Sequence, residues 1–401
     1  MRFLSVTESY FPFMEKGGPT VKVRALARGL ADSGHSVTVL TADLGLDSVT
    51  QEMVHAIPCR WGYEALEEGV ETVFLRTRAR YRTLTWNPGA TAFCAKRLAA
   101  YDLVHIYGLY DLIGPQVARA CCRLGRPYVV EPMGMFRPIV RNLWLKRLYH
   151  VAFGKAMIRG ANRLIATSEQ ERQELLEGGV SASKIVVRRN GIEIPAALPA
   201  LGRFRDQWHI PSDAKLVLFL GRLVPKKSPD LMLEAFAHWK RHESGPRPSM
   251  LVVAGPDEGD GFRQRLETLA AQMGLNGGVL FTGPLYDDAK WSAYRDADLF
   301  VLPSQNENFG NTAAEAVACG TPVLVTDQCG IAPLIDQRAG LVVPHDRAAL
   351  EAGLRRILDD PAMSARLRAG CGEVARSLDW GEPLAQMESL YRQLVAGGHK
   401  G

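Results

Sequence analysis

Two glutamates eight positions apart, Glu307 and Glu315, have the spacing in this 401-residue chain that most clearly indicates chemistry. Glu307 lies in a polar loop after an apolar run that ends at Leu302, and Glu315 lies about one turn inside the short helix that follows. Backbone N–H groups at a helix N-terminus, together with the positive end of the helix dipole, form a site for phosphate. Glu307 can then accept hydrogen bonds from sugar hydroxyls, and Glu315 can accept them from a ribose. This arrangement predicts a nucleotide-sugar site.

The segment 303–325 resembles the donor-site signature of glycosyltransferase family 4, whose members are retaining enzymes of the GT-B fold. The family pattern is Pro-Ser, a few residues, Glu-Gly-Phe-Gly, then Glu-Ala-Met-Ala-x-Gly-x-Pro-Val. This chain has Asn308 in place of the first glycine and Val317 in place of the methionine, and it keeps the spacing. The resemblance implies that Glu315 binds the ribose and that Glu307 orients the sugar together with the next backbone segment. That segment comprises Asn308, Phe309, Gly310 and Asn311.

A second segment, starting at Gly221, follows an apolar run at 216–220. It is similar to the family pattern Gly-Arg-Leu, three residues, Lys-Gly-x-Asp, with Ser228 in place of the glycine. Breaking the anomeric bond leaves a nucleoside diphosphate with growing negative charge, which a cation must receive. The resemblance implies that Arg222 and Lys227 take this role, so we expect neither a metal ion nor another cofactor. It gives the catalytic set Arg222, Lys227 and Glu307.

The pair Asp296 and Asp298 has the Asp-x-Asp spacing that metal-dependent glycosyltransferases of another architecture use to hold a divalent ion. Here the pair precedes the apolar run at 299–302, whereas ligands gather at the carboxyl ends of parallel strands. We interpret it as a helix-to-strand junction. The seven cysteines form an odd set without a Cys-x-x-Cys pair, which predicts neither a disulfide framework nor a zinc site.

Several glycines sit directly after predicted strands or before helices, which is where the chain must turn tightly. The resemblance assigns Gly255 and Leu285 to a nucleobase pocket, and Gly17 and Gly18 to a loop beside the donor phosphate and the acceptor. Gly221 would contribute to the donor site. A dehydrogenase is disfavoured because the dinucleotide fingerprint Gly-x-Gly-x-x-Gly is absent.

The acceptor side departs from the family. Tyr107 stands where the family has a histidine at the reaction centre, and Met133 stands where relatives often have histidine. Tyrosine, with a reference pKa of about 10, is a poor base at neutral pH. Retaining enzymes of this family are thought to pass the acceptor proton to the leaving phosphate oxygen, so activity need not depend on a protein base. His105 is expected in the core, on the other side of its strand from Tyr107.

Short apolar runs alternate with helical patterns along the whole chain, which predicts parallel sheets covered on both faces. An Asn-Gly turn and two prolines near residue 193 interrupt the pattern. We predict an α/β protein of GT-B type: an acceptor-binding Rossmann-like domain at 1–193, a nucleotide-sugar-binding one at 194–378 facing it across a deep cleft, and a helix at 379–401 that returns to the first domain. Predicted strands cover 2–6, 36–40, 103–107, 128–131, 163–167, 185–188, 216–220, 250–254, 279–281, 299–302, 323–325 and 340–343.

Positive charge is concentrated in the first half, where residues 1–195 carry 26 Lys and Arg against 18 Asp and Glu. The stretch between Glu131 and Glu169 contains no acid and mixes basic with aromatic residues. Such a stretch can mark an anionic membrane, an anionic acceptor or nucleic acid, or it can be an ordinary amphipathic helix with solvated arginines. Nucleic acid is disfavoured because no recognised motif accompanies the charge.

We therefore expect a retaining glycosyltransferase that moves a sugar from a UDP- or GDP-sugar to a hydroxyl acceptor, such as a lipid-linked glycan in cell-surface polysaccharide synthesis. No signal peptide or membrane-spanning run is evident, so we expect a cytoplasmic protein that associates with the inner membrane face. Two alternatives remain open: a sugar-nucleotide epimerase of the same fold, and a nucleotide-sugar-binding protein without turnover.

Overall fold

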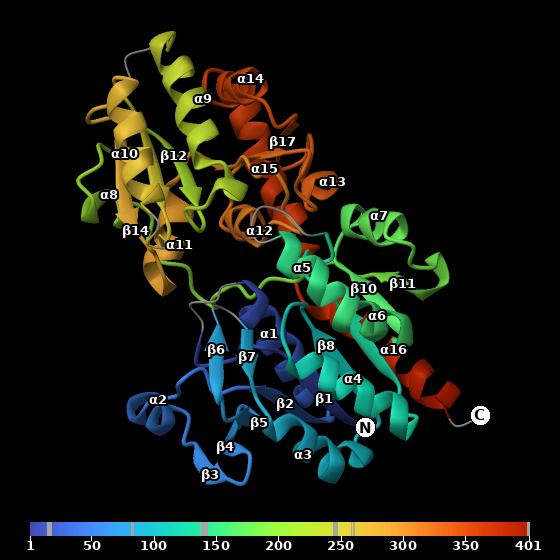
Figure 1. The fold of residues 1–401 in the computed structure, drawn as a ribbon. Coiled ribbons are helices and arrows are strands. Elements are labelled where there is room, and N and C mark those ends of the chain that lie inside the picture. Colours follow the sequence, from blue (N-terminus) through green and yellow to red (C-terminus); the bar gives the residue numbers. More distant parts are fainter. Residues whose placement is uncertain are drawn as a thin grey trace. The chain divides into compact units, whose positions relative to one another are not determined.

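The computed structural model describes residues 1–13, 18–81, 84–137, 143–243, 248–257, 259 and 261–398. The chain forms two compact units (Figure 1). Unit 1 comprises Met1–Gly191 and Trp380–Gly401, and unit 2 comprises Ile192–Asp379. The junctions thus fall at 191 and 379, where the sequence predicted 193 and 378.

Unit 1 contains a nine-stranded sheet in the order β11-β10-β9-β8-β1-β2-β5-β4-β3. Its strands are β1 (Arg2–Val6), β2 (Ser36–Ala42), β3 (Ile57–Cys59), β4 (Gly62–Glu67), β5 (Val70–Leu75), β8 (Leu103–Tyr107), β9 (Tyr128–Glu131), β10 (Arg163–Ala166) and β11 (Ile185–Val187). A separate two-stranded hairpin pairs β6 (Ala79–Tyr81) with β7 (Leu84–Trp86).

The sequence missed the strands between residues 57 and 86. β5 pairs in parallel with β2, but β4 and β3 then continue the sheet antiparallel, so the expectation of a purely parallel sheet is wrong at this edge. The turn between β4 and β5 has Glu68 at φ 51° and Gly69 at φ 76°. Two consecutive positive φ angles are typical of a tight hairpin turn. In β4 only Gly62 and Ala65 are buried, unlike the central parallel strands, such as β8, in which every residue is buried.

Helices cover both faces of this sheet. They are α1 (Gly18–Asp32), α2 (Ser48–Met53), α3 (Gly89–Arg97), α4 (Ile113–Leu124), α5 (Leu143–Tyr149), α6 (Lys155–Gly160), α7 (Glu169–Glu177) and α16 (Gly381–Gly398), with 3-10 turns at Leu98–Ala100 and Ala182–Lys184 and a π-helical turn at His150–Gly154. The C-terminal helix α16 packs with α1 on one face, where Met387 and Tyr391 join a core with Phe3 and Leu26.

Unit 2 contains a six-stranded parallel sheet in the order β14-β13-β12-β15-β16-β17. Its strands are β12 (Lys215–Leu220), β13 (Ser249–Ala254), β14 (Val279–Gly283), β15 (Leu299–Leu302), β16 (Val323–Thr326) and β17 (Gly340–Val343). Renumbered from β12, this is the 3-2-1-4-5-6 order of a Rossmann fold, which reverses between β12 and β15.

The helices of unit 2 also lie on both faces. They are α8 (Arg203–Gln207), α9 (Pro229–Arg241), α10 (Phe262–Gln272), α11 (Asp287–Asp296), α12 (Asn311–Ala318), α13 (Ala332–Ile335), α14 (Arg347–Leu358) and α15 (Pro361–Arg376), with a 3-10 turn at Pro225–Lys227. Along β12, Leu216 and Leu218 face the core beneath α11 and α12, whereas Val217 and Phe219 face the core beneath α9 and α14. Burial on both faces explains why this strand reads as a continuous apolar run.

Candidate functional site

The predicted chemical residues of unit 2 gather where its strand order reverses. β12 pairs with β13 on one side and with β15 on the other. The loop after β12 carries Arg222 and Lys227, and the loop after β15 carries Glu307. In open α/β sheets, ligands bind outside the carboxyl ends of the strands at such a reversal.

Lys227 and Glu307 meet directly. The Lys227 Nζ donates to Glu307 Oε2, and the side chains are 15% and 18% exposed. An ammonium has three N–H donors and a carboxylate can accept several hydrogen bonds. Both groups therefore retain capacity for a ligand while each fixes the position of the other.

The backbone on either side of Glu307 is anchored to both neighbouring loops. Gln305 N–H donates to the carbonyl of Lys226 at 2.9 Å, which ties this loop to the loop after β12. Glu307 N–H donates to Gln328 O at 2.8 Å, and Gly330 N–H donates to Glu307 O at 2.9 Å, which ties it to the loop after β16. Glu307 is thus held rigidly although it lies on a loop.

Glu315 is held by α11. Its carboxylate accepts from Lys290 Nζ and from the Tyr294 hydroxyl, each at 2.9 Å. Burial, and next the neighbouring Glu315, raise the pKa of Tyr294 well above its usual value, so the hydroxyl remains a donor. Lys290 and Tyr294 are four residues apart on one helix face, a pairing that we did not anticipate from the sequence. Glu315 keeps acceptor capacity beyond these two contacts.

The N-terminus of α12 has no side-chain cap, and its first turn carries no acid. Gly310 precedes the helix at φ 107°, a conformation that favours glycine. Three buried oxygen atoms in this segment, Ser304 Oγ, Asn308 Oδ1 and Thr312 Oγ1, find no hydrogen-bond partner among the described residues. Buried polar atoms without partners call for an explanation, and a polar ligand at the uncapped helix end supplies one.

The remaining residues predicted to bind the donor also contribute to backbone turns or to the core of unit 2, which the sequence did not predict. Gly255 has φ 147°, and a Cβ there would stand 1.8 Å from the carbonyl oxygen of Gly221, so no side chain fits between the ends of β12 and β13. Phe309 and Leu285 are 2% and 9% exposed and belong to the core of unit 2. Asn311 is the first residue of α12. Their predicted contacts with a donor remain predictions.

Arg222 lies on the same loop as Lys227, with an exposed side chain. Ser228, directly after Lys227, has φ 50° although it is not glycine. Its hydroxyl lies 3.0 Å from Nε2 of His345, in the loop after β17. The loop that carries both cations is thus fixed from a third strand end, through a histidine that the sequence analysis overlooked.

Asp296 and Asp298 both have structural partners. Asp296 accepts from the backbone N–H groups of Gly202, Phe204 and Arg205 at 2.6–3.1 Å. Asp298 accepts from Arg205 and from Leu216 N–H at 3.0 and 2.8 Å. Their interpretation as a helix-to-strand junction is confirmed. Over the described ranges, no group of three or more His, Cys, Asp or Glu side chains is arranged to hold a metal ion.

In unit 1, the predicted acceptor-side residues lie at the ends of β8 and β9. Gly17 lies outside the described residues, and Gly18 begins α1. Met133 is half-buried at φ 54°. Tyr107 is only 2% exposed, and burial raises its pKa well above its usual value. Its hydroxyl therefore stays protonated at neutral pH.

His105 is in the core, as expected, but its predicted side of the strand is wrong. The His105 and Tyr107 rings stack at 3.8 Å, because residues two apart on a strand share a face. His105 Nδ1 lies 2.5 Å from the Tyr391 hydroxyl of α16. Burial lowers the pKa of His105 to about 3, so the ring is neutral.

A buried charge cluster surrounds Glu131, and no motif in the sequence indicates it. Glu131 accepts from Lys22 Nζ at 2.6 Å and, with both oxygens, from Arg188 at 2.7 and 2.8 Å. Burial alone would raise the pKa of Glu131, but Arg188 and then Lys22 outweigh it and bring the value to about 2. Three charges from distant sequence positions are thus sealed together in unit 1.

Two family models match the chain. Residues 202–377 match the family described as glycosyl transferases group 1, and residues 17–191 match the glycosyl transferase 4-like domain. The D-inositol 3-phosphate glycosyltransferase of Streptomyces bingchenggensis is 34% identical over 320 residues, covering 76% of this chain and 70% of that protein. The protein of the same name from Thermomonospora curvata is 30% identical over 398 residues, covering 94% and 90%.

Two solved structures are similar to this chain over nearly its whole length. Sucrose-phosphate synthase from Thermosynechococcus elongatus has a TM-score of 0.76 at 25% identity and covers 99% of each chain. The Anabaena protein HepE, in complex with UDP and glucose, has a TM-score of 0.77 over 98% of this chain and 100% of its own. Its 17% identity makes it a likeness of fold alone.

Proposed function

Because this chain belongs to the glycosyltransferases with a group 1 domain and a 4-like domain, which have the GT-B fold, we propose that it is a sugar transferase acting on a hydroxyl acceptor. The proposed donor is a UDP- or GDP-sugar. The anomeric configuration of the sugar is retained in the proposed reaction. The observation that carries the proposal is the contact between Lys227 and Glu307 at the point where the strand order of unit 2 reverses. A cation for the diphosphate and a carboxylate for the sugar thereby lie side by side.

Each donor group then has a partner. The diphosphate would lie against Arg222, Lys227 and the uncapped N-terminus of α12. Glu307 would accept hydrogen bonds from the sugar, and Glu315, oriented by Lys290 and Tyr294, would accept them from the ribose. As the bond between the anomeric carbon and the phosphate oxygen breaks, the acceptor oxygen bonds to that carbon on the same face. The acceptor proton passes to the departing phosphate oxygen.

The cations take the role that a metal ion plays in other transferases, so we propose that no metal is required. Charge-assisted hydrogen bonds of this kind contribute roughly 1.5–3 kcal/mol each. They act where charge develops, so they lower the barrier more than they strengthen substrate binding.

For the acceptor, we propose a lipid-linked glycan used in cell-surface polysaccharide synthesis and reached from the cytoplasmic side of the membrane. The excess of basic residues in the first half of the chain supports an anionic surface or acceptor there. D-inositol 3-phosphate, from the name of the relatives, is the soluble acceptor to test against it. Over the described residues, no helix is long and apolar enough to cross a bilayer.

A panel of nucleotide-sugars, with and without EDTA, tests the donor. The matching compound at 100 times its Kd should stabilise the protein by about 2.7 kcal/mol in a thermal melt. Arg222→Ala should abolish most transfer, and NMR of the product should show the donor's anomeric configuration. An inverted product, or full activity in Arg222→Ala, would contradict the proposal. A free epimerised sugar formed without acceptor would identify an epimerase, and donor binding without turnover would identify a binding protein.

A further inference from the structure

The helical segment from α5 to α6 in unit 1 carries two apolar faces where an ordinary surface helix has one. One face is buried: Tyr149, Met157 and Ile158 are 7%, 2% and 8% exposed and join the core beneath the sheet. The other consists of Trp144, Leu148 and Val151, which are 68%, 57% and 68% exposed. A helix with a single core-facing stripe would place polar residues there.

The three exposed residues are spaced i, i+4 and i+7, so they form one stripe along the helix. The π-helical turn His150–Gly154 joins α5 to α6 without interrupting the helix. A Cβ at position 154 would stand 2.8 Å from Nδ1 of His150, so glycine leaves room for the His150 ring. His150 Nε2 in turn lies 2.9 Å from the Tyr110 hydroxyl, which ties the segment to the loop after β8.

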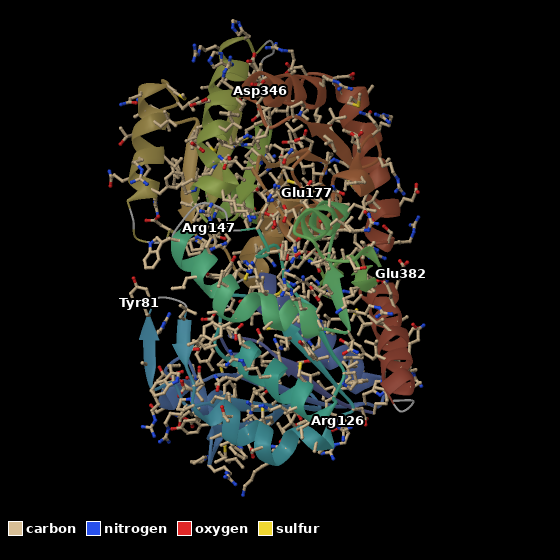
Figure 2. All side chains as sticks on the ribbon, turned by 45° about the vertical axis from the view of Figure 1, so that its right-hand side comes forward. Tyr81, Arg126, Arg147, Glu177, Asp346 and Glu382 are labelled. Atoms are coloured by element: carbon tan, nitrogen blue, oxygen red, sulfur yellow. The ribbon has the colours of Figure 1, made fainter. Side chains whose placement is uncertain are left out.

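Positive charge accompanies the stripe. Arg147, Lys155 and Arg159 are exposed on the same segment, and Arg147 is labelled in Figure 2. None of the three forms an ion pair with a described residue, in contrast to Arg137, which pairs with Glu177 at 3.3 Å. No acidic residue occurs in the sequence between Glu131 and Glu169. Uncompensated cations beside an apolar stripe complement an anionic lipid surface.

We propose that Trp144, Leu148 and Val151, flanked by Arg147, Lys155 and Arg159, form a docking surface for an anionic lipid bilayer. The apolar side chains enter the boundary between head groups and acyl chains, and the basic side chains contact lipid phosphates. Tryptophan is well suited to this depth, because its ring is apolar and its N–H can bond to head groups.

A second copy of this chain fits the surface less well. A symmetric dimer would place the same three cations against each other, and three exposed apolar side chains fall short of the roughly 1,000 Å² that a specific interface needs. A membrane has neither restriction. Docking on a bilayer would bring the enzyme to the lipid-linked acceptor proposed above. Docking itself does not depend on the transfer reaction.

Sedimentation of the full chain with phosphatidylcholine vesicles, with and without phosphatidylglycerol, tests the proposal. Wild type should bind only the anionic vesicles, and added salt should weaken binding. Leu148→Asp should abolish binding, and each of Arg147→Gln and Lys155→Gln should weaken it about fivefold. Matched controls are Val49→Asp, at an apolar residue 72% exposed on α2, and Arg123→Gln, at an exposed arginine of α4. Both should bind like wild type.

Quenching of tryptophan fluorescence by brominated lipid provides a second readout, which Trp144→Phe should remove. Equal binding of wild type and Leu148→Asp, or equal binding to neutral vesicles, would overturn the proposal. So would a wild-type dimer in light scattering that Leu148→Asp dissociates. Thermal shifts by nucleotide-sugars should be the same in Leu148→Asp and wild type, so a failure of the donor assignment can be told apart from a failure of docking.

Discussion

The two units contain the same kind of ion pair in opposite settings. In unit 1, Lys22 and Glu131 are 4% and 0% exposed, and Arg188 and His105 occupy the rest of the carboxylate's surroundings. In unit 2, Lys227 and Glu307 are 15% and 18% exposed. In each unit the lysine follows the strand at which the strand order reverses: Lys22 follows β1, and Lys227 follows β12. Glu131 ends β9, and Glu307 follows β15.

The difference lies in what covers each pair. The Glu131 cluster is sealed by α16, whose Tyr391 contacts His105, and by Trp380, whose ring lies 5.7 Å from the Arg188 guanidinium. The Lys227–Glu307 pair remains partly exposed, and Glu307 lies in the loop that leads into the uncapped N-terminus of α12. A sealed pair contributes to the fold and cannot meet substrate, whereas a partly exposed pair on anchored loops can serve a ligand.

The largest effect is expected from Glu131→Gln. Loss of the carboxylate leaves Lys22 and Arg188 buried without a counter-charge, which typically costs about 3–5 kcal/mol. Urea denaturation measures the change. Glu68→Gln is the control, because Glu68 pairs with Arg24 and Arg28 while 36% exposed, and such pairs contribute only about 0–1 kcal/mol. Equal stability of both variants would mean that the buried cluster is not structural.

Acidification should also lower the stability of the folded protein, because it protonates groups of the same buried cluster. The pKa of His105 falls from 6.5 to about 3 on folding, and that of Glu131 falls from 4.5 to about 2. In both cases the unfolded chain binds the proton more readily, so the stability that these two groups contribute is complete above pH 6.5 and declines as the pH falls toward 2. Burial raises the pKa of Asp111 to about 6, which acts in the opposite direction, so wild type and His105→Gln must be compared. Between pH 6.5 and pH 4.5 the denaturation midpoint of wild type should fall more than that of His105→Gln. An equal change in both proteins would argue against a neutral, buried His105.

Lys227→Ala should lower activity and leave stability nearly unchanged, in contrast to Glu131→Gln, which should lower stability. Loss of a cation that acts on the leaving group should lower kcat by about two to three orders of magnitude. Stability should change by no more than about 1 kcal/mol, because the pair is partly exposed. Initial-rate kinetics and urea denaturation of the same preparation give both values, with Lys226→Ala as the neighbouring control. A stability loss as large as that of Glu131→Gln would make both pairs structural.

Glu315→Gln should weaken donor binding more than it slows chemistry. A charged hydrogen bond to the ribose contributes roughly 1.5–3 kcal/mol, which corresponds to a rise in KM of about tenfold to a hundredfold. Steady-state kinetics separate KM from kcat. An effect of the same size on a donor that lacks the ribose 2′- and 3′-hydroxyls would show that Glu315 acts on Lys290 and Tyr294 instead of on the nucleotide.

The smallest change is expected from Ser228→Gly. Glycine removes the strain of φ 50°, worth about 1 kcal/mol, but it also removes the contact with His345, worth about 0.5–1.5 kcal/mol. Stability should therefore stay within about 1 kcal/mol. His345→Ala, which loses the contact and keeps the strain, should cost more stability and more activity. If His345→Ala matched wild type in both, the loop after β17 would have no part in positioning Lys227.

Most of the fold could be predicted from the sequence, because buried parallel strands leave continuous apolar runs. All twelve predicted strands occur in the structure within two residues of their expected ends. The strands between residues 57 and 86 were missed for two reasons. Half-buried antiparallel strands and short hairpin strands carry no such run. The buried strand β5 pairs in parallel with β2, but Glu71 and Thr72 interrupt its apolar residues.

The candidate site was predictable only in part. The resemblance of two local segments to family motifs marked Lys227 and Glu307, and the strand order of the sheet brings the two residues together. Lys290, Tyr294 and His345 lack such a signal, since an ordinary surface helix or loop can hold the same residues.

By itself, the sequence determined the two α/β units, the donor-site motifs and the uneven distribution of charge, because these depend on residue type and short-range spacing. Only the tertiary structure decided which charges are sealed and which remain accessible. Glu131 and Glu307 both come after apolar strands, and the chain folds a distant arginine and the last helix over one of them and not over the other. Burial depends on contacts between residues far apart in the chain, and those contacts fix the pKa values and the role of each carboxylate.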